Sequence, residues 1–123
     1  MKIIEAINAI DALKVNSFSE VEKIRWLSTL DGIIKEEIID THEGGESVTF
    51  NGYDESTPTT QELLIGQPYD NIYIQWLEAQ IDYANGEYNK YNNSITAYNN
   101  TYAALEKWYT RNHMPKRVKI KYF

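Results

Sequence analysis

Apolar residues in the C-terminal half recur at alternating steps of three and four over about ten helical turns. The stripe consists of Ile74, Leu77, Ile81, Ala84, Tyr88, Tyr91, Ile95, Tyr98, Tyr102, Leu105 and Tyr109. It predicts a helix that begins near Asp70 and ends near His113, before Pro115. A left-handed turn at Asn85 and Gly86 would divide this run into two antiparallel helices. Because the spacing continues through that point without a shift, it favours one continuous or kinked helix.

Two shorter helices are predicted before this stripe. The first spans residues 2–13, and the second follows overlapping capping boxes in residues 17–22 and continues to about Thr41. The boxes pair Ser17 with Glu20 or Ser19 with Glu22. The inward positions of the second helix are Val21, Ile24, Leu27, Leu30, Ile34 and Ile38, with Trp26 beside them. The predicted fold is therefore all-α.

Residues 42–60 break the helical pattern and predict a long irregular loop. Gly44–Gly45 and Asn51–Gly52 are turn signals, while the apolar residues between them indicate that the loop packs on the body. A short turn of helix is expected from Gln61 to Ile65. After the long helix, Val118, Ile120 and Tyr122 alternate with charged residues, which predicts an extended arm. One domain over residues 1–115 is expected, followed by this arm over 116–123.

Charge is distributed unevenly along the 123 residues, whose formal net charge is −6. Twelve Asp or Glu and no Lys or Arg occur from Glu36 to Asn89. Five bases and no acid occur from Arg111 onward. An acidic body repels DNA, so sequence-specific nucleic-acid binding is not expected.

The tyrosines of the stripe combine a large ring with a hydroxyl group that needs a partner. Stacking on single-stranded bases would also require a positive groove, which this region lacks. Packing in the core, with some ring surface left for another subunit, is the better interpretation. The residues expected at subunit contacts are Tyr88, Tyr91, Tyr98 and Tyr102.

Other features of the sequence restrict the cellular setting. No run approaches the roughly 20 apolar residues that cross a bilayer, and the N-terminus does not have the pattern of a secretory signal. The chain contains no cysteine, which excludes disulfides and suits a reducing cytoplasm. Neither membrane association nor export is expected.

No motif predicts a reaction. His42 lies among acidic residues, but neither HExxH nor a carboxylate-x-x-His repeat is present, so a metal site is the weaker interpretation. A position at a helix C-terminus explains His42 better. The acidic run from Glu36 to Glu55 is typical of a solvated face, and no Gly-rich phosphate loop occurs. We therefore expect no enzyme, with no catalytic, metal-binding or cofactor-binding residues.

Several stretches between residues 25 and 115 match a pattern shared by one group of proteins. They are residues 41–46 (THEGGE), 50–54 (FNGYD), 57–58 (TP), 62–64 (ELL), 68–70 (PYD), 81–87 (IDYANGE), 91–93 (YNN) and 108–115 (WYTRNHMP). Together they resemble small proteins that tailed phages and prophages of Gram-positive bacteria encode in the head–tail connector region, where adaptor and head-completion proteins lie.

This resemblance implies a small helical, non-enzymatic protein that forms a ring under the portal and completes the DNA channel. An extended C-terminal segment engages the portal in such adaptors. The corresponding residues here are Lys116, Arg117, Lys119, Ile120, Lys121 and Phe123. An acidic loop facing the channel would let DNA slide by like-charge repulsion. Its residues would be Glu43, Glu46, Asp54 and Glu55.

The expected partners are therefore the portal, neighbouring head–tail proteins and further copies of the chain. The expected location is the virion neck, after assembly in the bacterial cytoplasm. An alternative is a DNA-packaging accessory protein that resembles a small terminase subunit, although the acidic body disfavours it.

Overall fold

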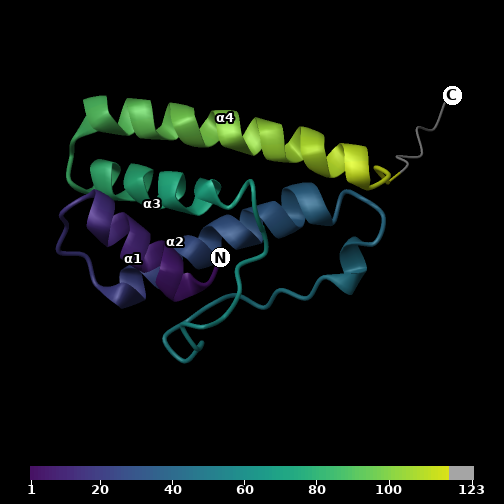
Figure 1. Cartoon of the computed structure of the whole chain (residues 1–123), viewed down its shortest axis with the longest axis horizontal. Coiled ribbons are helices and arrows are strands. Elements are labelled where there is room, and N and C mark those ends of the chain that lie inside the picture. Colours follow the sequence, from purple (N-terminus) through teal and green to yellow (C-terminus); the bar gives the residue numbers. More distant parts are fainter. Residues whose placement is uncertain (117–123) are drawn as a thin grey trace, which may run out of the picture.

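The computed structural model describes residues 1–116, and every regular element within them is helical (Figure 1). The α-helices are α1 (Ile3–Leu13), α2 (Glu20–Ile34), α3 (Asn71–Ala84) and α4 (Tyr88–Asn112). A π-helical turn, η1 (Lys35–Ile39), continues α2, and a 3₁₀ turn, η2 (Gly45–Ser47), lies in the next loop. The all-α prediction is confirmed for this part of the chain. The predicted arm lies outside it, except for Lys116.

The N-terminal half follows the capping chemistry of its sequence. Ser19 is the N-cap of α2, and its hydroxyl oxygen accepts a 3.2 Å hydrogen bond from the backbone N–H of Glu22. Of the two caps that the sequence offers, Ser19 is thus the one used. Val21 was expected to point inward but is 43% exposed. It occupies the first turn of α2, ahead of the point where Ile24 enters the core.

The end of the second helix is wider than an α-helix. Residues 35–39 form a π-helical turn in which the adjacent Ile38 and Ile39 are both buried. Gly45 then packs so closely on this turn that a Cβ atom would collide with the carbonyl of Ile39. The helix and the loop that follows therefore fit together only with glycine at this position.

The segment from Gln61 to Ile65 is extended, so the short helix predicted there is wrong. Its backbone pairs instead with the N-terminus, and the N–H of Leu63 donates a 2.9 Å hydrogen bond to the carbonyl of Met1. Leu63 and Ile65 are both buried, a period of two that fits an extended chain. A helix here would lose these partners and turn one of the two side chains outward.

The continuous helix favoured by the sequence is also wrong, because the chain reverses between α3 and α4 (Figure 1). Gly86 adopts φ +72°, the left-handed conformation that glycine takes without strain. The N–H of Glu87 donates to the carbonyl of Asp82 and closes the turn. Ala84 and Tyr88 carried the unbroken spacing across this point, yet both are exposed. The regular three-and-four spacing across the turn therefore came from two residues that contribute nothing to the core.

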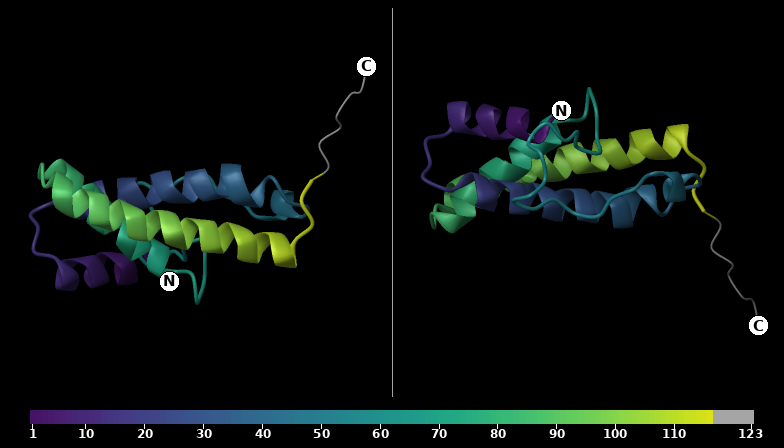
Figure 2. Two further views of the ribbon diagram at one scale, coloured as in Figure 1. Left: turned by 90° about the horizontal axis from the view of Figure 1, so that it is seen from above. Right: turned by 90° about the horizontal axis from the view of Figure 1, so that it is seen from below.

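Helix α3 is central and packs against α1, α2 and α4. Figure 2 shows α2 and α4 running along the length of the molecule, with α1 beside one half of them. Leu77 and Ile81 of α3 and Leu105 of α4 are fully buried. The ring of Trp76 lies 5.0 Å from that of Tyr98, which joins α3 to α4.

The turn provides a test of the hairpin. Substituting Gly86→Ala should lower the free energy of unfolding by about 1 kcal/mol, because alanine resists positive φ and its Cβ meets no neighbouring atom there. Gly66→Ala is the matched control, since its Cβ also enters open space and its φ is not positive. Urea unfolding followed by circular dichroism measures both variants. Equal losses in the two would contradict the assignment of strain to the turn.

Candidate functional site

The most unusual polar group in the interior is the carboxylate of Asp31 on α2, which is fully buried. Its Oδ1 accepts a 2.6 Å hydrogen bond from the hydroxyl of Tyr73. Its Oδ2 accepts from the hydroxyl of Tyr53 at 2.5 Å and from the N–H of Leu64 at 3.1 Å. The Tyr73 hydroxyl in turn accepts from the N–H of Ile65 at 2.8 Å. We call these residues the Asp31 cluster.

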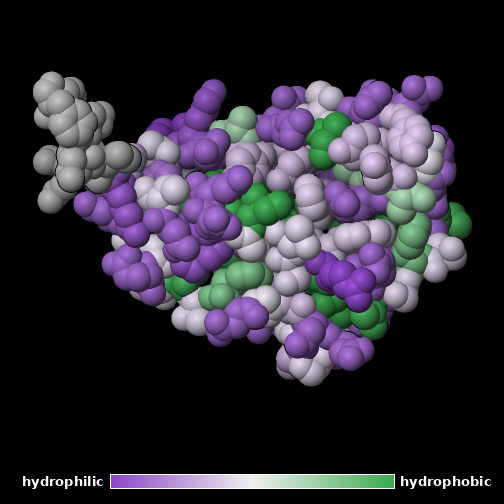
Figure 3. All heavy atoms as spheres, turned by 180° about the vertical axis from the view of Figure 1, so that it is seen from behind, coloured by the Kyte–Doolittle hydropathy of each residue, from purple (hydrophilic) through white to green (hydrophobic). Residues whose placement is uncertain are grey.

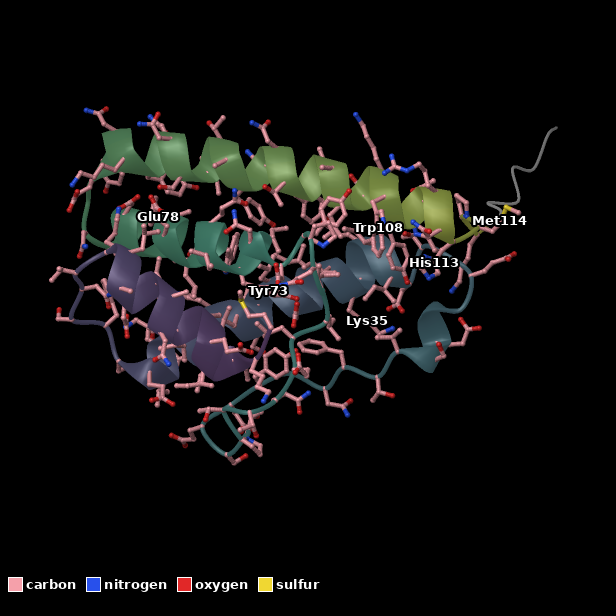
Figure 4. The ribbon with its side chains drawn as sticks, in the orientation of Figure 1. Lys35, Tyr73, Glu78, Trp108, His113 and Met114 are labelled. Carbon is pink, nitrogen blue, oxygen red and sulfur yellow. The ribbon has the colours of Figure 1, made fainter. Side chains whose placement is uncertain are left out.

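The Asp31 cluster holds the long loop on the helices. Tyr73 belongs to α3 and points into the interior (Figure 4), whereas Tyr53, Leu64 and Ile65 belong to the loop. Burial raises the pKa of Asp31, and the hydrogen bonds from Tyr53, Tyr73 and Leu64 only partly oppose this. Burial beside this carboxyl also raises the pKa of both tyrosines. Asp31 and Tyr73 are fully buried, so their polar groups join elements of the fold and offer no surface to a substrate.

Two further buried charges join helices rather than forming a site. Lys14 pairs with Asp82, whose carboxylate is 1% exposed and also accepts a 2.6 Å hydrogen bond from Ser94 of α4. Lys23 of α2 lies 2.6 Å from Asp11 of α1, and this bond holds the pKa of Asp11 below its ordinary value. Each charge is paired, as burial requires.

His42 is buried against the C-terminal turn of α4, where its ring lies 5.0 Å from that of Tyr109. Its Nδ1 lies 2.6 Å from the carbonyl of Ile38 and therefore carries the proton of that hydrogen bond. Its Nε2 lies 2.9 Å from the hydroxyl of Thr110. Both ring nitrogens are thus used in packing the end of η1 against α4, which agrees with the helix-end interpretation.

The chain after α4 is fastened to the same place. The N–H of Glu43 donates to the carbonyl of Met114 at 2.8 Å, and the N–H of Lys116 donates to the carbonyl of Thr41 at 2.9 Å. His42 and Pro115 form an antiparallel bridge between these two bonds. We call this pairing the C-terminal bridge. It fixes the position and direction in which the chain leaves the body (Figure 4 labels His113 and Met114 here).

Of the residues predicted to contact the portal, the structure places only Lys116, which is exposed. The others lie outside the described residues. They are Arg117, Lys119, Ile120, Lys121 and Phe123.

The four acids predicted to line a channel are exposed but lie in two separate pairs. Glu43 and Glu46 flank η2, next to the C-terminal bridge. Asp54 and Glu55 line a hollow of about 190 Å³ with Arg25, near the start of α2. Hydrogen bonds from Ser56 lower the pKa of Asp54. The helical segment that separates the pairs, from Arg25 to Ile39, is about 20 Å long. The acids therefore do not form one surface on the monomer.

The tyrosines predicted at subunit contacts divide in a similar way. Tyr98 is 7% exposed, and its burial raises its pKa to about 12. Tyr102 donates a hydrogen bond to Glu37 across the helix interface. These two rings belong to the monomer's own core, which removes Tyr98 from any exposed surface. Tyr88 is 60% exposed, and Tyr91 packs on Tyr83 at the α3–α4 turn.

Exposed apolar side chains gather at the α3–α4 turn and the adjacent end of α1. They are Leu13 (61% exposed), Val15 (97%), Tyr83 (58%) and Tyr88 (60%). The ion pair from Lys14 to Asp82 places the first two beside the last two. We call this surface the apolar end. It lies opposite the C-terminal bridge (Figure 1), and apolar colour appears at the corresponding end in Figure 3.

Sequence reasoning missed the buried charges, although a signal for them exists. Asp31 is four residues after Leu27 and three before Ile34, which puts it on the apolar face of α2. Lys23 stands four residues before Leu27 on the same face. A charged residue in phase with core positions predicts a buried, paired group, and the aromatic partners in the loop supply the pairing.

Within residues 1–116, no three His, Cys, Asp or Glu side chains are grouped so that they could hold a metal ion. The same part of the chain contains no helix with the length and apolar character needed to cross a membrane. No protein-family model matches the sequence, and no curated protein or solved structure was found to match it.

The Asp31 cluster predicts a large effect from a small substitution. Tyr53→Phe removes one donor to a buried carboxylate and should lower the free energy of unfolding by about 1–3 kcal/mol. Tyr88→Phe removes a hydroxyl from an exposed ring and should change it by less than about 0.5 kcal/mol. Urea unfolding at neutral pH compares them. Equal stabilities would show that the Tyr53 bond does not hold the loop.

The raised pKa of Asp31 predicts a dependence of stability on pH. Because the folded-state pKa lies above the unfolded value, the stability that Asp31 contributes is complete below about pH 4 and declines as pH rises through the folded pKa. The free energy of unfolding of the wild type minus that of Asp31→Asn should therefore fall as the pH rises above about 4. Urea titrations at several pH values measure this difference. A difference that grows with pH would contradict the raised pKa.

Proposed function

We propose that this protein is a non-enzymatic adaptor of a phage head–tail connector, acting entirely through protein contacts. The observation that supports this most is the placement of its contact features at opposite ends. The apolar end lies at one end of the molecule, and the C-terminal bridge releases the chain at the other (Figure 1). A molecule of this form suits a part that joins two neighbours.

The polar interior favours the same role. The buried charges Asp31, Lys23 and Asp82 each have partners within the monomer. His42 has both ring nitrogens engaged in packing. A catalytic centre needs polar groups that face a substrate, and these four groups face only the chain itself.

In this proposal the protein occupies the virion neck as a ring of copies beneath the portal. Residues 116–123 anchor the layer to neighbouring chains, the portal among them. Residues 1–116 carry 18 acids against nine bases, which would reduce adhesion to passing DNA. Because the acids form two pairs on the monomer, a continuous acidic lining would require several copies side by side.

The test is assembly with the portal protein encoded by the same phage or prophage genome. Mixing the purified full chain with portal rings should add a layer of density under the portal in electron micrographs. A variant ending at Lys116 should add none, whereas Asn100→Ala, on the exposed face of α4, should add a normal layer.

The two ways in which this test can fail have different meanings. If no layer forms with the full chain, the connector role is wrong. If the shortened variant forms a normal layer, the arm is not the anchor, although the connector role survives.

A further inference from the structure

A groove of about 260 Å³ runs between two loop segments, residues 49–53 and 61–64. Phe50, Tyr53 and Leu64 supply its apolar surface, and each is only partly buried. The ring of Phe50 lies 5.1 Å from that of Tyr53, edge to face, which holds both against the body. We call this the loop groove.

One side of the loop groove has backbone N–H groups without partners. Within the described part of the chain, the N–H groups of Thr49, Phe50, Asn51 and Gly52 have no hydrogen-bond partner. The opposite side is different, since the N–H of Leu63 is bound to Met1 and that of Leu64 to Asp31. Successive N–H groups of an extended chain point to alternate sides, so only alternate donors among these would face an extended chain that adds as a strand in the groove.

The charge around the loop groove selects the occupant. No Lys or Arg occurs from Glu36 to Asn89, so the loop that forms the groove carries a net negative charge. Glu62 lines the groove with its side chain 63% exposed and pairs with the N-terminal ammonium of Met1 at 3.3 Å. Asp54 and Glu55 directly follow Tyr53 and are exposed in the adjoining hollow beside Arg25. An extended segment that enters here should therefore be basic on one face and apolar on the other.

The end of this chain has that pattern. The sequence of residues 117–123 is Arg-Val-Lys-Ile-Lys-Tyr-Phe, in which three bases alternate with apolar residues. Added as a strand, it would direct Val118, Ile120 and Tyr122 to one face and the bases to the other. The apolar face fits Phe50 and Leu64, and the basic face fits the acids.

The C-terminal bridge indicates that the occupant comes from another copy. The pairing in this bridge is antiparallel. Met114 is bonded to Glu43, and Lys116, two residues later, is bonded to Thr41. The chain therefore leaves toward η1, while the loop runs the opposite way toward Thr49. Continuing in the direction set at Lys116 leads away from the groove of the same molecule.

We propose that the loop groove receives residues 117–123 of a second copy as an added β-strand. The contact is heterologous, because a different surface is used on each molecule, and repeating it produces a ring or a filament. This inference uses the proposed function only in taking the protein to act as an assembly of copies. It names the copy-to-copy joint, which the portal experiment does not identify.

Cysteine cross-linking tests the joint, since the natural chain contains no cysteine. Thr49→Cys, which is exposed in the groove, is mixed with a size-tagged Ile120→Cys and oxidised. The expected result is a disulfide-linked heterodimer at several times the yield from Ile120→Cys mixed with Asn100→Cys. The control keeps the arm cysteine and moves the acceptor to the exposed face of α4. Equal yields from the two mixtures would overturn the proposal.

Two further variants separate the alternatives. The double variant Thr49→Cys/Ile120→Cys should form dimers and higher species, and a cross-link closed within a single chain at high dilution would overturn the second-copy assignment. Adding Lys119→Glu and Lys121→Glu to the arm should reduce the heterodimer yield several-fold, whereas Arg at both positions should preserve it. Unchanged yield with Glu would refute the basic-face contact. These measurements need no portal, so a failed connector role leaves them interpretable.

Discussion

The buried carboxylate of Asp31 joins three parts of the chain through hydrogen bonds. It belongs to α2, receives a hydroxyl from Tyr73 of α3, and receives a hydroxyl and an N–H from the loop. Removing a carboxylate from water costs several kcal/mol unless donors replace the lost hydration. Here the donors come from segments distant in sequence, so the charge is tolerated only when α2, α3 and the loop are assembled together.

This constraint determines how the surface is presented. The loop has little regular structure of its own, and its position depends on Tyr53 and Leu64 reaching Asp31. The loop groove is therefore held in place by a buried carboxylate that its own residues Tyr53 and Leu64 contact, and the exposed pair Asp54 and Glu55 directly follows Tyr53. A long loop that would otherwise be mobile becomes a defined surface.

Much of the helical framework could be predicted from the sequence because it rests on local chemistry. The cap at Ser19 and the apolar faces of α1 and α2 follow from residues that are close together in the sequence. The hairpin could not be obtained from periodicity, since the exposed residues Ala84 and Tyr88 happened to preserve the phase across Gly86. The extended segment after Gln61 depends on pairing with Met1, a contact between residues about sixty positions apart.

The candidate surfaces show the same division. Tyr88 is exposed although it continues the spacing of the stripe, whereas Tyr98 packs on Trp76 and Tyr102 donates to Glu37, both of other elements. Whether a tyrosine ring is buried depends on the residues that pack on it from other elements. The spacing within one helix does not show which residues these are. The Asp31 cluster was missed for the same reason, since its donors come from two other segments.

The C-terminal bridge is made of backbone groups, and its bonds do not depend on the side chains that follow Lys116. The direction in which the chain leaves the body at Lys116 and the sequence of residues 117–123 are therefore separate properties of this protein. If residues 117–123 bind a partner as proposed, mutations beyond Lys116 would change that binding without changing where the segment starts. Such a division would let the sequence after Lys116 change, and with it the proposed partner, on an unchanged helical body.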